Sequence, residues 1–268
     1  MKSMPRSLPA PARFLAIVPV VLVSYFACPA ETLALGDYVG VEAAPWSQGL
    51  TGKAAIDTSS TQGTQIDFRN DLGLENRDMT PAGRVWFRWG KSHLTFDYSN
   101  STRAGDGTFS QNVTFNGTSY SSGETVASEY DLNLLSAQYR YSFLNLKVAE
   151  LGVGLGLNVA QIRMQVDGSV SGLTNFDENV PYPTLNAAFI VKPLPGFHIR
   201  AEADGLSVDV SGNRVSILDA RIQFESYFAH AFGIFGGYRS YRFTVDANDF
   251  GHVENSFKGP YIGLGVKF

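Results

Sequence analysis

The last ten residues of the chain form one alternating segment that ends on an aromatic side chain with no charged tail after it. In most water-soluble proteins the end of the chain frays into polar residues. Here one face of a period-two strand stays apolar to the final residue, and it carries Pro260, Ile262, Leu264, Val266 and Phe268. The sequence therefore predicts a chain end that is built into a sheet, with this face against protein or lipid.

The other end of the chain has the pattern of a secretory signal. Three basic residues precede an uncharged apolar run at 14–27, and small residues suited to cleavage follow it. This order is typical of a secretory signal peptide, and the run is too short and too interrupted by Pro19 for a transmembrane helix. We assign residues 1–34 to a cleaved signal peptide and residues 35–268 to the mature domain.

Cys28 is the only cysteine in the chain and falls within the predicted signal peptide. Cleavage would leave the mature protein without a disulfide or a reactive thiol. A lipoprotein is the alternative for this residue, but Tyr25 stands where a lipobox normally carries Leu. We therefore expect the fold to be stabilised by another device, such as closure of a barrel, which pairs every backbone group.

Composition and charge narrow the class of protein. The net charge is −4 and no basic run or patch occurs, so nothing points to a nucleic-acid partner. Aromatic residues make up 13% of the chain, glycine occurs 27 times, and no later apolar stretch is long enough for a helical span. These values fit a β-rich chain and do not separate a membrane barrel from a soluble β-sandwich.

The repetition of alternating segments along the chain distinguishes a membrane barrel from a soluble β-sandwich. Short and long connections join, in turn, about ten alternating segments of roughly ten residues, as a membrane barrel requires. These segments are 38–46, 81–90, 92–101, 126–143, 148–164, 184–192, 197–204, 215–230, 232–246 and 259–268. The pattern predicts an all-β fold: a transmembrane antiparallel up-and-down β-barrel of about ten strands, with eight or twelve as alternatives.

Details of this pattern add expectations about the loops. Twelve strands would require 65–68 and 108–115 to span the membrane, and we predict instead that they extend loop hairpins. We expect a loop at 167–183. The apolar phase changes near Leu134 and Leu135, which indicates a bulge there or an extension of the strand beyond the bilayer. Segment 232–246 is apolar on both faces at its start, so its phase stays unassigned.

Charged side chains recur in the middle of the predicted strands, on the face opposite the apolar one. A charge that faced lipid at the bilayer midplane would cost roughly 2–4 kcal/mol, so we expect these side chains to face the lumen and to pair there. The predicted lumen network consists of Glu42, Arg84, Arg88, His93, Asp97, Arg140, His198, Arg200, Glu202, Asp204, Asp219, Arg221 and Glu225. Aromatic residues near segment ends should form interfacial belts, namely Trp46, Trp89, Tyr141, Phe143, Phe197 and Phe268.

The terminal strand resembles that of Gram-negative outer-membrane β-barrels, in which a final Phe preceded by apolar residues at every second position is the assembly signal. Here those residues are Ile262, Leu264, Val266 and Phe268. Over the whole mature chain the sequence is similar in architecture to small outer-membrane barrels, the OmpA-like and porin-like group. The resemblance implies an outer-membrane location with both termini periplasmic. It also implies contacts with outer-membrane lipid or lipopolysaccharide, and with the barrel-assembly machinery during biogenesis.

The residues around the four histidines do not match the catalytic motifs of known outer-membrane enzymes. Resemblance to outer-membrane lipid hydrolases would require His-x-Ser, and resemblance to omptin proteases would require Asp-x-His; none of the four histidines has either. His93, Asp97 and Ser99 share a strand face, but alternate positions lie about 7 Å apart, too far for direct hydrogen bonds within one strand. No residue cluster indicates a metal or cofactor site. We predict that the chain is not an enzyme and has no cofactor.

The sequence thus predicts an integral outer-membrane barrel with a narrow, charge-lined lumen and long polar surface loops. Its role would be structural or in surface interaction with an unknown ligand, or that of a small-solute pore. An outer-membrane lipid hydrolase and a soluble secreted β-sandwich binding protein are the alternatives.

Overall fold

The computed structural model describes residues 38–57, 62–210, 213–228, 231–247 and 251–268. The predicted signal peptide at 1–34 and its Cys28 lie outside the described residues, as does His230. None of the described residues belongs to a helix that is long and apolar enough to cross a bilayer.

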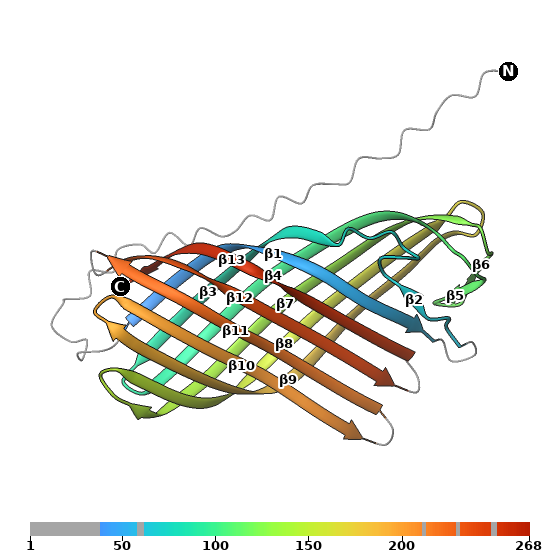
Figure 1. Ribbon diagram of the computed structural model, residues 1–268. Helices are drawn as coiled ribbons and strands as arrows, with labels where there is room; N and C mark the ends of the chain where they lie inside the picture. The colour runs from blue at the N-terminus through green and yellow to red at the C-terminus, as the bar shows by residue number, and fades with distance from the viewer. Residues whose placement is uncertain (1–37, 58–61, 211–212, 229–230, 248–250) are drawn as a thin grey trace. The chain divides into compact units, whose positions relative to one another are not determined.

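Ten long strands form one closed antiparallel sheet (Figure 1). Each long strand pairs with the next along the chain, and the last pairs with the first from Gly40↔Lys267 to Ile56↔Gly251. The strands are β1 (Tyr38–Ile56), β3 (Arg77–Trp89), β4 (Ser92–Thr108), β7 (Thr125–Asn145), β8 (Ala149–Gly168), β9 (Gly172–Leu194), β10 (Phe197–Val210), β11 (Asn213–Phe228), β12 (Phe232–Ala247) and β13 (Gly251–Lys267). The up-and-down barrel of ten strands is confirmed, and a two-sheet sandwich is excluded.

Three short strands belong to the loops at the end of the barrel opposite Phe268. β2 (Ile66–Asp67) pairs with β1, and β5 (Val113–Phe115) pairs with β6 (Thr118–Tyr120). The prediction that 65–68 and 108–115 are loop extensions and not spanning strands is therefore confirmed.

The two faces of the barrel wall exchange their chemistry partway along several of the long strands, and β8 shows this most clearly. Leu151, Val153, Leu155, Leu157 and Val159 face outward, followed on the same face by the polar residues Gln161, Arg163, Gln165 and Asp167. The inward face changes in the opposite sense, from Glu150, Gly152, Gly154, Gly156 and Asn158 to Ala160, Ile162, Met164 and Val166. On β7 the exchange occurs at the same level, because Leu135 pairs with Val159.

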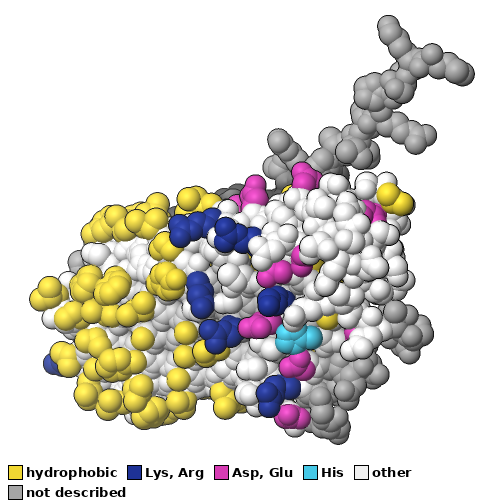
Figure 2. Space-filling view, turned by 45° about the vertical axis from the view of Figure 1, so that its right-hand side comes forward, with side chains coloured by type: hydrophobic (Ala, Val, Ile, Leu, Met, Phe, Trp, Pro, Cys, Tyr) yellow, Lys and Arg dark blue, Asp and Glu magenta, His cyan; other side chains and the backbone are white. Residues whose placement is uncertain are grey.

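We call the part with the apolar exterior the belt half and the part with the apolar interior the projecting half. The belt half carries both ends of the barrel domain, and its apolar side chains cover one end of the surface in Figure 2. A tilted strand crosses a bilayer in about 9–11 residues. β7, β8 and β9 have 21, 20 and 23 residues, so about half of each lies beyond the bilayer. The projecting half is built like a water-soluble protein, with polar residues outside and apolar residues inside.

This architecture corrects one expectation and decides between the two alternatives of another. The predicted loop at 167–183 is wrong, because β8 runs to Gly168 and β9 begins at Gly172. Near Leu134 and Leu135 the strand extends beyond the bilayer as predicted, but it has no bulge, since the pairing with β4 and β8 is continuous there. The apolar phase changes because the solvent changes from lipid to water, and not because the backbone slips.

Trp46 was also misplaced by sequence reasoning. Instead of joining an interfacial belt, its side chain is inside the barrel with 2% of its surface exposed. Its indole Nε1–H donates to the carbonyl oxygen of Gly259 at 3.1 Å. Trp89, Tyr141, Phe143 and Phe268 are exposed on the barrel exterior, as expected for belt residues.

Candidate functional site

The interior of the belt half is filled by one connected group of charged side chains. Glu202 on β10 is its hub, because guanidinium nitrogens of Arg84, Arg140 and Arg221 lie 2.9, 3.0 and 3.6 Å from its carboxylate. Asp97 on β4 also pairs with Arg84, at 2.8 Å, and with Arg221, at 3.2 Å. These residues come from five strands on different sides of the barrel, so the ion pairs cross the lumen.

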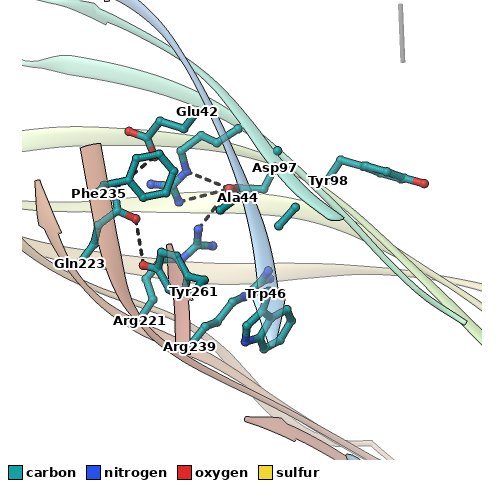
Figure 3. A pocket seen from close by; sticks show the side chains of 13 residues that line it. Glu42, Ala44, Trp46, Asp97, Tyr98, Arg221, Gln223, Phe235, Arg239 and Tyr261 are labelled. Carbon is teal, nitrogen blue, oxygen red and sulfur yellow. Dashed lines mark hydrogen bonds and ion pairs between the residues drawn. The ribbon is translucent and has the colours of Figure 1, made fainter. Parts of the chain in front are cut away.

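The network continues toward the projecting half through Asp219 and Arg239. Arg239 donates to Asp219 at 2.6 Å, and its guanidinium lies 4.8 Å from the centre of the Trp46 ring. In Figure 3 the side chains of Arg221, Gln223, Tyr261 and Arg239 converge inside the barrel, whereas Tyr98 points away from them. Trp46 therefore marks the level at which the charged interior ends and the apolar interior begins.

A second carboxylate hub lies toward the end of the barrel that carries Tyr38 and Lys267. Glu150 on β8 contacts Arg88 at 3.2 Å, His93 at 2.7 Å and Lys192 at 3.7 Å. A third carboxylate in this region, Glu225, pairs with Arg200 at 2.8 Å and lies 3.6 Å from His198. Arg200 is also 3.9 Å from Glu202, which links this region to the central network.

The structure places all thirteen residues of the predicted lumen network on the inward face of the barrel wall. Nine of them form ion pairs with other lumen residues, and the rings of His93 and His198 lie 2.7 and 3.6 Å from the carboxylates of Glu150 and Glu225. Glu42 and Asp204 instead accept hydrogen bonds from side-chain amides, those of Gln223 at 3.2 Å and Asn186 at 2.8 Å. These two carboxylates thus have polar partners, and no ion pair joins either to a cation among the described residues.

Sequence reasoning missed three members of the ion-pair network in the lumen. Glu150 is in phase with the inward glycines of its own strand, so its spacing from Gly152 was a signal that could have found it. Arg239 lies on the strand whose phase could not be read, and Lys192 stands at the end of a predicted strand. No pattern in the sequence indicated that these three side chains meet partners in the lumen.

The interior of the projecting half is closed by the connection between β1 and β3. Ile66, Phe68, Leu72 and Leu74 from this connection are each at most 3% exposed, because the segment folds back into the mouth of the barrel. We call these four residues the loop plug. They pack in one cluster with apolar inward side chains of the long strands.

Arg103 fastens the connection that carries the loop plug to the wall of the barrel. This buried side chain, 1% exposed, donates from Nη1 to the carbonyl oxygen of Glu75 at 2.7 Å. Its Nη2 donates to the carbonyl oxygen of Gln48 at 3.0 Å. A single guanidinium thus joins the end of the connection to strand β1.

The β5–β6 hairpin closes the rest of the mouth. Phe109 and Tyr120 are buried with their ring centres 5.4 Å apart. Glu124, which precedes β7, accepts hydrogen bonds from the backbone N–H groups of Ser121, Val170 and Ser171. These donors stabilise the carboxylate and lower the pKa of Glu124 to about 2. The carboxylate thereby ties the hairpin connection to the β8–β9 turn.

One grouping in the lumen contains the residue types of a hydrolase triad, but its geometry differs. Ser142 Oγ lies 3.1 Å from His93 Nε2 and 2.5 Å from Glu150 Oε1, to which it donates. The same His93 Nε2 is 2.7 Å from the same carboxylate oxygen. A triad needs one ring nitrogen on the hydroxyl and the other on the carboxylate. Here a single nitrogen faces both, and the serine proton is directed to the carboxylate.

No group of three or more described His, Cys, Asp or Glu residues is arranged to hold a metal ion. The four residues of the predicted assembly signal lie on the barrel exterior, and Ile262, Leu264 and Phe268 are 65%, 67% and 70% exposed. Their place on the wall suits contact with lipid, while the assembly role stays a prediction.

Comparisons with known proteins give structural likenesses only. No family model matches the chain, and no curated protein is similar to it in sequence. The outer-membrane protease OmpT from Escherichia coli is similar in structure, with a TM-score of 0.54 and 10% sequence identity over 89% of this chain and 99% of OmpT.

Two further Gram-negative structures match more remotely. They are the attachment invasion locus protein Ail of Yersinia pestis, with a TM-score of 0.35 and 8% identity over 87% of this chain and 98% of that one, and Neisserial surface protein A, with a TM-score of 0.32 and 13% identity over 87% and 97%. The closed sheet, the apolar belt and the likeness to OmpT agree. The chain has the fold of a ten-stranded outer-membrane β-barrel.

Proposed function

We propose that this protein is a non-conducting outer-membrane barrel that displays its projecting half at the cell surface as a scaffold for interaction. The observation that carries the proposal is that two separate groups of side chains fill the interior at different levels along the barrel. Buried ion pairs centred on Glu202 occupy the belt half, and the loop plug with its apolar neighbours occupies the projecting half. A solute would have to displace both to cross.

The division into a belt half and a projecting half also supports an orientation of the barrel in the outer membrane. A projecting half with a polar exterior belongs in water, and the two long connections of the barrel, between β1 and β3 and between β4 and β7, lie at its end, as do the surface loops of bacterial barrels. The belt half then lies in the outer membrane, with its outward apolar side chains in contact with lipid or lipopolysaccharide. Both ends of the barrel domain, at Tyr38 and Phe268, would face the periplasm.

We propose further that the chain is not an enzyme. The likeness to OmpT concerns the fold at 10% identity. The Ser142, His93 and Glu150 grouping has its serine proton directed to a carboxylate and lies in the belt half, far along the barrel from the loops. Reconstituted protein should therefore release no product from fluorogenic peptides or phospholipids, and turnover that is lost in Ser142→Ala would contradict this proposal.

Conductance of purified protein in planar lipid bilayers tests the main proposal. The expected record shows no steady channel activity from the wild-type protein. A variant in which the connection at 62–76 is replaced by a short Gly-Ser linker should also stay closed, because the ion-pair network of the belt half remains. Steady conductance on the nanosiemens scale from the wild type would refute the sealed barrel and favour a small-solute pore.

A further inference from the structure

A cavity of about 190 Å³ opens in the lumen at the end of the barrel that carries Tyr38 and Lys267. We call it the terminal cup. Of its thirteen lining residues five are Arg or Lys and two are His, while Glu225 is the one acidic residue among them. The surface of the terminal cup is therefore predominantly cationic, in a protein whose net charge is −4.

The carboxylates behind this surface do not balance its positive charge. Arg88 and Lys192 share a single carboxylate, that of Glu150. Arg200 pairs with Glu225. Arg140 pairs with Glu202, a carboxylate that also serves Arg84 and Arg221. Arg84 and Arg221 have Asp97 as a further partner. The four lining cations Arg88, Lys192, Arg200 and Arg140 thus meet three carboxylates, and Lys267 is the fifth lining cation.

That lysine, Lys267, forms no ion pair with a carboxylate of the described residues. Its ammonium lies over the ring of Tyr227, 3.9 Å from the ring centre, and 5.7 Å from the centre of the Tyr38 ring. Two electron-rich rings hold the charge in place but do not neutralise it. The charge of Lys267 is attracted by the carboxylate of Glu225 and repelled by the ammonium of Lys192. A bound anion would relieve this repulsion.

The terminal cup is closed on its inner side. Arg84, Asp97 and Glu202 fill the lumen beyond it, each at most 8% exposed, and the adjoining space in the central network measures about 40 Å³. Anything that enters the terminal cup must leave by the same opening. The cavity therefore has the form of a binding site and not of a passage.

We propose that the terminal cup binds the oxyanion group, a carboxylate or a phosphate, of a small water-soluble solute. Lys192 and Lys267 would donate charge-assisted hydrogen bonds to it, and Arg88 would contribute further donors. A cavity of about 190 Å³ has room for several water molecules and suits a small anion. The side chains that line the terminal cup face the lumen and not the surrounding lipid, which favours a dissolved solute over a lipid headgroup. The assignment goes beyond the surface role proposed above and does not depend on it.

Isothermal titration of the detergent-solubilised full barrel with inorganic phosphate, and separately with citrate, at low ionic strength tests the proposal. Wild-type protein should bind at least one of the two anions saturably, with one site per chain. The double variant Lys192→Gln with Lys267→Gln should weaken binding by roughly a hundredfold, tenfold for each charged hydrogen bond lost.

The matched control is Lys91→Gln with Lys147→Gln, which removes the same charge from two exposed lysines in turns at the same end of the barrel. It should bind like the wild type. Heat-modifiable gel mobility must show that every variant is a folded barrel. Absence of saturable binding to both anions, or an equal loss in the two double variants, would overturn the proposal. Binding of short-chain phosphatidylglycerol with no response to either free anion would assign the terminal cup to lipid and overturn the solute assignment.

Discussion

Replacing the hub of the lumen network tests whether the buried charges hold the belt half together. Glu202→Gln keeps the size of the side chain but removes the charge that Arg84, Arg140 and Arg221 share. Glu202 is 6% exposed, so water cannot replace the lost charge. Removing one partner from a buried ion pair costs about 3–5 kcal/mol, and we expect this substitution to fall in that range or above it.

An exposed ion pair of the same length provides the matched control. Arg163 and Asp177 lie 3.0 Å apart on the outside of the projecting half. Arg140 and Glu202 lie the same distance apart inside the barrel. Their side chains are 55% and 54% exposed. Water screens such pairs, so Asp177→Asn should cost about 1 kcal/mol or less.

Reversible urea unfolding in phospholipid vesicles, followed by tryptophan fluorescence, measures both free energies of unfolding. The double variant Arg140→Gln with Glu202→Gln should recover part of the loss, because it leaves one fewer uncompensated guanidinium. If Glu202→Gln costs no more than Asp177→Asn, the lumen charges do not stabilise the barrel and the reasoning fails.

Three further predictions concern other parts of the molecule. Leu155→Arg, on the lipid-facing side of β8, should lower the free energy of unfolding in vesicles by about 2–4 kcal/mol, whereas Gln161→Arg on the same face should leave it nearly unchanged. Leu72→Ala in the loop plug should cost about 2–5 kcal/mol and speed proteolysis of the 62–76 connection. Glu124 has a pKa of about 2, below its ordinary 4.5, so its stabilisation of the loop is complete above about pH 4.5 and is lost as pH falls toward 2. The rate of amide hydrogen exchange near Ser171 should show this pH dependence in the wild type and lose it in Glu124→Gln.

The belt half was predictable because one period-two rule applies to all of its strands. Because apolar side chains face lipid and charged ones face the lumen, the rule predicts that Leu155 points outward and Arg200 points inward, without knowledge of their contacts. The same rule failed at 167–183, where the aromatic side chains Phe176 and Tyr182 point inward and polar residues face water. With the phase inverted and few apolar residues, a projecting hairpin resembles a polar loop.

The meeting of distant side chains was not predictable from local pattern. Arg140 and Glu202 are 62 residues apart in the chain, and their contact depends on how the strands are staggered around the barrel. In the loop plug only Ile66 belongs to a strand, the short β2, whereas Phe68 and Leu72 follow an Asx turn at Asp67 and precede the positive φ of Gly73. Such turns are set by tertiary packing as much as by sequence.

The two halves of the barrel have opposite interiors because one lies in lipid and the other in water. Cysteine accessibility on β8 tests this explanation, in a Cys28→Ser background that removes the one native thiol. In intact Gram-negative cells a membrane-impermeant maleimide should label Gln161→Cys rapidly. Leu155→Cys should stay protected by lipid, and Ile162→Cys should stay protected by the apolar interior. Rapid labelling at either protected position, or no labelling at Gln161→Cys in a folded barrel, would contradict the account.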